Sequence, residues 1–183
     1  MENNRKLQVR FSMCRRGRLL RAAAIMLVAA CFSQGQLPPA EAATATGNLN
    51  VQITIQAECT LGTINTVNFA THGVLNTNVD STGSLSVTCT NTTAYNIGLD
   101  AGAGSGATIA ARLMTGTGAA TVTYSLYIDS GRTQVWGSTI GTDTVAATGT
   151  GAAQSYTVYG RVPPQTTPAP GIYTDTVVVT VTY

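Results

Sequence analysis

The segment between Asn48 and Gln56 alternates strictly between polar and apolar residues. Successive side chains of a β-strand point to opposite faces, so this period of two predicts a half-buried strand over residues 48–56. Such a strand can complete the sheet of its own molecule or that of another, and the pattern alone leaves both open. The apolar members of this ladder are Leu49, Val51, Ile53 and Ile55.

The end of the sequence repeats the pattern, and we expect a strand over residues 172–183. No polar segment follows Tyr183 in this sequence. A sheet that ends on this strand would present an uncovered apolar edge, which a strand from another molecule could cover. The face expected to line that edge consists of Val177, Val179, Val181 and Tyr183.

Residues 1–42 have the pattern of a secretory signal peptide. Seven basic residues precede the apolar run Ala22–Phe32, which is too short to span a bilayer as a helix. The run is followed by Ala40-Glu41-Ala42, a small-residue cleavage pattern. Cleavage between Ala42 and Ala43 would leave a single domain of residues 43–183.

Two other interpretations of the leader are open. Val28-Ala-Ala-Cys31 resembles a lipobox, which would make Cys31 a lipid-bearing terminus, and Arg15-Arg16 resembles a twin-arginine signal. We favour an ordinary secretory signal over both. Lipid anchoring through Cys31 is not expected. Adjacent arginines in a basic leader more often only contribute positive charge than form a twin-arginine signal.

The charge of the predicted domain excludes two classes of partner. Most basic residues lie in the leader, and residues 43–183 keep only Arg112, Arg132 and Arg161 against six acidic residues. A charge-poor, slightly acidic domain lacks the basic surface that binds nucleic acid. It also lacks the polybasic segment that binds an anionic membrane.

Two cysteines, Cys59 and Cys89, remain after the leader. An even number in an exported protein predicts a disulfide. Closing a loop of about 30 residues would stabilise the fold by roughly 3–4 kcal/mol on the chain-entropy model. A zinc site is the poorer interpretation, because His72 alone could join the two thiols and zinc prefers four ligands. We therefore expect no metal.

The composition of residues 43–183 predicts an all-β domain. Thr, Gly, Val and Ala are common, whereas Leu, Glu and Lys are scarce, which disfavours helices. Short apolar runs separated by turn residues are typical of a sandwich or barrel. Asp129-Ser-Gly131 predicts a hairpin turn, and Pro163–Pro170 an exposed connection. Between the two terminal strands we expect strands near 63–69, 83–90, 94–100, 107–114, 121–129, 133–136 and 153–162.

Taken in order, several segments resemble the spore coat protein U domain family, the subunit type of archaic chaperone–usher pili. No single segment is specific, but their order and spacing are, and they extend over essentially all of residues 43–183. The segments are Thr46–Ile55, Glu58-Cys-Thr-Leu-Gly62, Gly83-Ser-Leu-Ser-Val-Thr-Cys89, Tyr124-Ser-Leu-Tyr-Ile-Asp129, Gly160-Arg-Val-Pro163 and Gly171–Tyr183.

The resemblance implies an incomplete immunoglobulin-like β-sandwich that is completed by donor-strand complementation. The donor strand would lie at about 44–53, with the odd-numbered ladder as its plugs, although Ile53 and Ile55 could belong to the first native strand. The acceptor groove would lie beside the C-terminal strand. The implied partners are a periplasmic chaperone, an outer-membrane usher and neighbouring pilus subunits. The implied protein is a secreted surface subunit that serves adhesion or biofilm formation.

Other functions were weighed against this one. A spore or cell-coat protein assembled without an usher is one alternative. A secreted carbohydrate-binding module is another, in which Trp136 and several tyrosines would form a sugar platform. No enzyme and no cofactor are expected, because His72 has no nucleophile elbow beside it and the acids are scattered turn formers. These acids include Asp80, Asp100, Asp129, Asp143 and Asp175.

Overall fold

The computed structural model describes residues 41–183, which fall into two units that divide between Asn50 and Val51. Residues 41–58 have no regular secondary structure, and the strands all lie in the second unit. The predicted leader, with Cys31 and Arg15-Arg16, lies outside the described residues except for its last two. Within residues 41–183, no helix is both long and apolar enough to cross a membrane.

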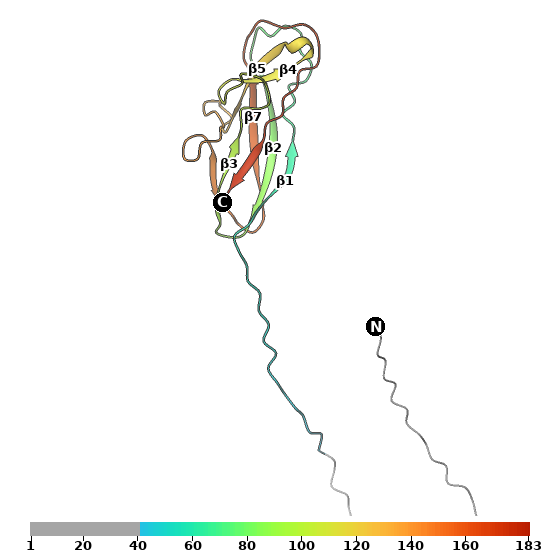
Figure 1. Cartoon of the computed structure of the whole chain (residues 1–183), viewed down its shortest axis with the longest axis vertical. Helices are drawn as coiled ribbons and strands as arrows, with labels where there is room; N and C mark the ends of the chain where they lie inside the picture. The colour runs from blue at the N-terminus through green and yellow to red at the C-terminus, as the bar shows by residue number, and fades with distance from the viewer. Residues whose placement is uncertain (1–40) are drawn as a thin grey trace, which may run out of the picture. The chain divides into compact units, whose positions relative to one another are not determined.

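The strands of the second unit form two antiparallel sheets, which confirms the predicted all-β class (Figure 1). The larger sheet has the order β1-β2-β7-β5-β4, and the smaller has the order β6-β3-β8. The strands are β1 (Cys59–Asn65), β2 (Val79–Cys89), β3 (Ala94–Leu99), β4 (Arg112–Thr115), β5 (Thr121–Tyr127), β6 (Val145–Thr148), β7 (Ala153–Val162) and β8 (Val179–Thr182).

The core consists of alternate side chains from both sheets, as the period of two requires. Leu85 and Val87 of β2 face Ile97 and Leu99 of β3, and all four are almost fully buried. Trp136 packs among them with 1% of its surface exposed. Its indole N–H donates to the carbonyl of Ile97 at 2.9 Å, so this large aromatic side chain is both buried and satisfied.

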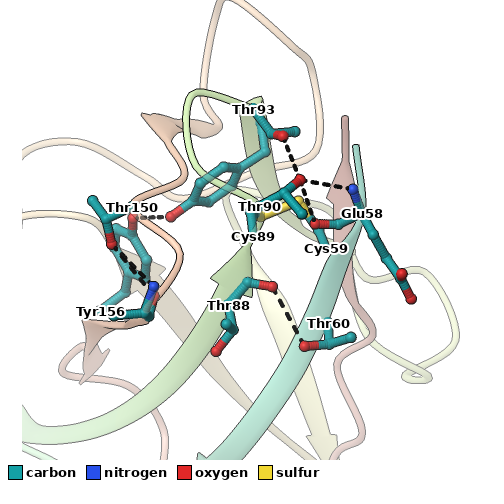
Figure 2. The surroundings of a disulfide bond; sticks show 11 residues. Glu58, Cys59, Thr60, Thr88, Cys89, Thr90, Thr93, Thr150 and Tyr156 are labelled. Atoms are coloured by element: carbon teal, nitrogen blue, oxygen red, sulfur yellow. Dashed lines mark hydrogen bonds between the residues drawn. A yellow bond between two sulfur atoms is a disulfide. The ribbon is translucent and has the colours of Figure 1, made fainter. Parts of the chain in front are cut away.

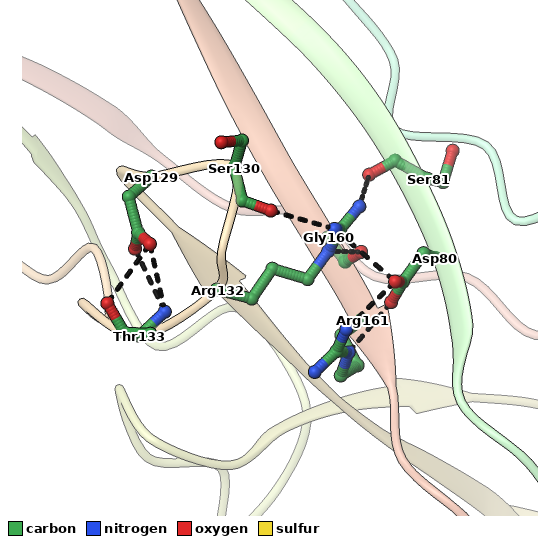
Figure 3. A network of polar contacts seen from close by, with 8 residues as sticks. All are labelled: Asp80, Ser81, Asp129, Ser130, Arg132, Thr133, Gly160 and Arg161. Carbon is green, nitrogen blue, oxygen red and sulfur yellow. Dashed lines mark hydrogen bonds and ion pairs between the residues drawn. The ribbon is translucent and has the colours of Figure 1, made fainter.

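Arg132 fastens the 129–136 hairpin to the outer face of the larger sheet (Figure 3). Its Nε donates to the Gly160 carbonyl at 3.1 Å, and its Nη1 lies 3.3 Å from Asp80. Asp80 also accepts two hydrogen bonds from Arg161, its cross-strand neighbour, at 2.7 and 2.9 Å. One carboxylate therefore links two arginines and couples the hairpin to β2 and β7.

The predicted hairpin turn is present, but the strand expected after it is not. Asp129 accepts hydrogen bonds from the backbone N–H groups of Thr133 and Gln134 at 2.9 and 2.8 Å. Beyond the turn, pairing is limited to one isolated bridge between Tyr127 and Val135. The prediction for 133–136 was therefore wrong in extent. The Trp136 N–H still donates to the Leu126 carbonyl, but the next residue leaves β5, and its carbonyl accepts from the Leu99 N–H of β3.

Other boundaries also differ from the predictions. No strand forms over 48–56, since that segment has no hydrogen-bonding partner in the structure. The expected strand at 63–69 lies earlier, as β1, the one at 107–114 shortens to β4, and the one at 172–183 shortens to β8. β6 was missed, and its sequence Val-Ala-Ala-Thr has a weak strand signal.

Candidate functional site

A groove of about 760 Å³ separates the chain that follows β1 from the chain that leads into β8. One wall is formed by residues 66–73 with Leu75, and the other by residues 167–175. In Figure 1 these two connections cross the upper end of the molecule, beside β4 and β5. The predicted exposed connection at Pro163–Pro170 contributes part of the second wall.

The floor of the groove is apolar. Val79, Val122, Tyr124 and Val162 contribute side chains from the inner face of the larger sheet, and half-buried Met114 adds a fifth. These residues come from the starts of β2 and β5, the end of β7, and β4. The walls add further half-buried apolar side chains, which are Val67, Phe69, Leu75 and Tyr173.

Two strand glycines make room for the first wall. A Cβ built on Gly160 would lie 2.7 Å from Val67 Cγ1 and 2.8 Å from Phe69 Cζ. A Cβ on Gly83 would lie 2.8 Å from the other methyl group of Val67. Since contacts this short do not occur, these glycines let the chain after β1 cross directly over the inner face of the sheet.

The second wall is fixed by one carboxylate. Asp175 accepts a hydrogen bond from the Tyr124 hydroxyl at 2.7 Å and another from the Ala103 N–H at 2.8 Å. Burial raises the pKa of Tyr124, and its hydrogen bond to Asp175 raises it further, so the hydroxyl remains a donor. Thr174 forms two backbone hydrogen bonds with Thr115, which hold the same segment against β4.

The two strands whose connections form the walls of the groove, β1 and β8, are both edge strands. β1 lies at one end of the five-stranded sheet and β8 at one end of the three-stranded sheet, so each has a free row of backbone donors and acceptors. Of the predicted acceptor residues, Val177, Val179 and Val181 are half-buried against the core. Tyr183 departs from them, because 58% of its surface is exposed.

The predicted donor ladder is exposed to solvent along its full length. The exposed fractions are 88% for Leu49, 87% for Val51, 81% for Ile53 and 71% for Ile55. Four large aliphatic side chains at alternate positions therefore bury little of their surface in this chain. Isolated exposed aliphatic residues are ordinary, but a regular ladder of them is a candidate contact surface.

The groove and the start of β1 lie at opposite ends of the larger sheet. β2 begins at Val79, on the floor of the groove, and ends at Cys89. Cys89 pairs with Cys59 in register and is joined to it by the predicted disulfide (Figure 2). An 11-residue strand spans about 33 Å, so the segment before Cys59 enters the sandwich at the end remote from the groove.

The sequence model of the Spore Coat Protein U domain matches residues 45–180. The chain belongs to this family. Protein U of Myxococcus xanthus is 37% identical over 174 residues, a match that covers 87% of this chain and 97% of the relative. Family membership, expected from the sequence, is therefore confirmed.

A solved structure with a similar fold comes from archaic chaperone–usher pili. It is the crystal structure of the CsuC–CsuE chaperone–tip adhesion subunit pre-assembly complex of the Csu pili of Acinetobacter baumannii. The TM-score is 0.52 at 24% sequence identity, and the match covers 71% of this chain and 41% of that chain. This similarity shows that the two proteins share a fold.

The residues considered for catalysis, metal binding or sugar binding are not brought together in this Spore Coat Protein U domain. His72 lies on the exposed rim of the groove. Asp129 and Asp175 are occupied by backbone hydrogen bonds. Among residues 41–183, no three His, Cys, Asp or Glu side chains gather as metal ligands. Trp136 is buried, so it forms no part of an exposed sugar platform.

Sequence reasoning missed several residues that shape the groove. The sequence predicts a strand at Val67 and Phe69, whereas these residues form a wall that crosses the sheet. Gly83 and Gly160 were noted only as parts of motifs. A glycine inside a strand pattern is itself a signal of close backbone approach, and this signal could have found both.

Proposed function

We propose that this protein is a structural subunit of a secreted surface fibre, assembled when the N-terminal strand of one subunit fills the groove of the next. The observation that supports the proposal is the coincidence of two unpartnered surfaces. One is the exposed ladder that contains Val51 and Ile53, and the other is the apolar groove between the chain that follows β1 and the chain that leads into β8. Each has the geometry that the other requires.

The position of the groove favours a fibre over a closed pair. The segment that carries the donor ladder leads into Cys59, about 33 Å along β2 from the groove floor at Val79. A contact between opposite ends of identical subunits is heterologous. Such contacts form open filaments unless the rotation between subunits closes a ring.

The energetics require that insertion also completes the acceptor fold. Burying four aliphatic side chains is worth roughly 6–12 kcal/mol. Ordering a ten-residue segment costs about 1–2 kcal/mol per residue, which equals or exceeds that gain. Backbone hydrogen bonds to the free strand edges and the closing of the apolar groove supply the surplus. Dissociation would then require partial unfolding of the acceptor and would be slow.

The proposed partners follow from this mechanism. A subunit with an open apolar groove needs a chaperone that covers it in the periplasm and an outer-membrane usher that directs the exchange, as the family resemblance implies. We place the donor strand at about residues 44–53, after cleavage between Ala42 and Ala43. The fibre would lie on the cell surface and serve adhesion or biofilm formation.

A spore or cell-coat assembly is the second candidate. The description of the family as Spore Coat Protein U favours it, and the name Protein U of the Myxococcus xanthus relative is consistent with it. The same donor strand could join subunits in a coat without an usher. Chaperone and usher genes beside this one would favour the pilus, and their absence would favour the coat.

Deletion of residues 43–53 tests the proposal. The shortened chain should still bind a chaperone and accept a strand from an intact subunit, but it should not add to a growing polymer. Electron microscopy and non-denaturing gels of the secreted material would measure this. Fibres of normal length made from the deletion variant alone would refute the proposal.

A further inference from the structure

Gln165 occupies a break in the larger sheet. Extending the register of β5 and β7, in which Ser125 faces Arg161, places Thr123 opposite Pro163. Proline has no N–H group, so the backbone ladder cannot continue there. The side-chain amide of Gln165 takes its place. Its Oε1 accepts from the Thr123 N–H and its Nε2 donates to the Thr123 carbonyl, both at 2.9 Å.

The backbone beside Gln165 also holds the opposite wall of the groove. The Gln165 N–H donates to the carbonyl of Leu75 at 2.9 Å. The Leu75 N–H in turn donates to the Thr167 hydroxyl at 2.8 Å. Leu75 and Thr167 belong to different walls, and both line the groove. We call Thr123, Gln165, Thr167 and Leu75 the clasp.

The clasp matters because an empty apolar groove tends to close. Two apolar walls with no strand between them gain from contact with each other, which would remove the binding site. A site that is open in only a fraction of molecules binds with an affinity reduced by that fraction. A connection that fixes the separation of the walls therefore speeds capture of a strand without touching that strand.

We infer that Gln165 is a positioning residue that fixes the separation of the two walls of the groove, so that an incoming strand meets a preformed site. This inference rests on the proposed donor-strand function. The half-buried Gln165 is anchored to β5 by its side chain and to Leu75 by its backbone. Loss of its amide frees the segment that carries Thr167 from the sheet.

The test measures association of a synthetic peptide of residues 44–57 with the full exported chain. Val51→Asp and Ile53→Asp are introduced into every protein sample, so that the chains cannot donate to one another. A labelled peptide reports association and dissociation rates by fluorescence anisotropy. A peptide with the same two aspartates is the negative control.

The variants separate the clasp from general stability. Gln165→Ala and Gln165→Met both remove the amide, and the methionine keeps its length. Thr167→Val removes the hydroxyl that accepts from Leu75 while keeping its shape. Gln134→Ala, in the exposed hairpin, is the matched control. Thr90→Val removes the hydroxyl that accepts from the Glu58 N–H at the far end of the sandwich, and it controls for lost stability.

We expect both Gln165 variants to slow association about tenfold, with a smaller change in dissociation, since preorganisation acts on the free protein. Thr167→Val should slow association by about threefold, and Gln134→Ala and Thr90→Val should match the parent. If a Gln165 variant fails to fold, as judged by circular dichroism, the association rate of Thr167→Val relative to the parent tests the inference.

Two results would overturn the inference, and they are distinguishable. Equal association rates for the parent, the folded Gln165 variants and Thr167→Val would overturn the role of the clasp and leave the proposed function standing. If the parent binds neither peptide, or both equally well, the proposed function fails and the inference fails with it.

Discussion

At the scale of single residues, Arg112 is held by backbone groups from three separate segments. It is fully buried at the start of β4, and its guanidinium donates to four carbonyl oxygens. The distances are 2.8 Å to Asp100, 3.0 Å to Ile109, 3.2 Å to Leu99 and 2.7 Å to Trp136. Burial lowers its pKa below the usual value, although nearby acidic groups oppose this effect.

Replacing Arg112 by methionine should therefore destabilise the fold strongly. The variant leaves four interior carbonyls without a donor, and each unsatisfied group costs about 1–3 kcal/mol. We expect a loss of at least about 4 kcal/mol in the free energy of unfolding, measured by urea denaturation. Arg112→Lys should lose less, because an ammonium group keeps some of the bonds. A methionine variant as stable as the parent would contradict this account.

Asp80 makes a different prediction, about pH. A hydrogen bond from Arg161 holds its pKa below the ordinary value of 3.8, partly opposed by desolvation, and the charge of Arg132 contributes in the same direction as Arg161. A lowered folded-state pKa gives stability that is present above 3.8 and is lost as the pH falls through the folded-state value. The effect is modest, since Asp80 is about one third exposed.

Asp80→Asn should thus lower the free energy of unfolding at neutral pH. It should also reduce the further loss of stability as the pH falls into the acid range. Urea denaturation at several pH values between about 5 and 2 would measure it. Glu58→Gln is the control, an exposed carboxylate with no arginine partner among residues 41–183. A parallel decline in Asp80→Asn and the parent would show that the ion pairs do not contribute.

The residue scale also shows where sequence reasoning stops. Residues 43–183 contain three arginines, and nothing in their sequence neighbours distinguishes buried Arg112 from the more exposed Arg161. Its burial depends on carbonyls from three separate segments converging on one point. Only the folded chain brings them together, so no local pattern could have predicted it.

At the scale of elements, the glycine pair in β2 and β7 shapes the groove. Gly160 and Gly83 admit the chain after β1, and Phe69 then lies edge-on to Tyr124, with ring centres 6.2 Å apart. The wall is therefore specified by missing side chains as much as by apolar ones.

Gly160→Ala should displace Val67 and Phe69 and lower stability by about 1–3 kcal/mol, the usual penalty for overpacking. It should also narrow the groove and weaken strand capture. Gly47→Ala is the control, since a Cβ there meets no atom within 4 Å and the residue does not line the groove. Thermal unfolding and peptide binding of both variants would test this. Equal behaviour would contradict the assigned role of Gly160.

Strand patterns were predicted well where both edges of a strand are paired. β2, β3, β5 and β7 lie close to their expected ranges, because their alternation is fixed by the core. The segment 48–56 has an equally clear alternation but forms no strand in this chain. Alternation predicts which faces a strand would have, whereas hydrogen-bonding partners decide whether it forms.

At the scale of the whole molecule, this chain has an exposed ladder, an open groove and two free sheet edges. The ladder belongs to the segment before Cys59, and the groove lies at the other end of β2.

Disulfide trapping tests the central claim most directly. The exported chain would carry Ile53→Cys on the ladder and Met114→Cys on the groove floor, with Gln52→Cys and Met114→Cys as the control pair.

We predict a series of covalent oligomers on a non-reducing gel from the variant with Ile53→Cys and Met114→Cys. The control variant, with Gln52→Cys and Met114→Cys, should stay monomeric, because position 52 faces away from the floor of the groove. A cross-link closed within a single chain, or none at all, would contradict the claim that one subunit completes the next.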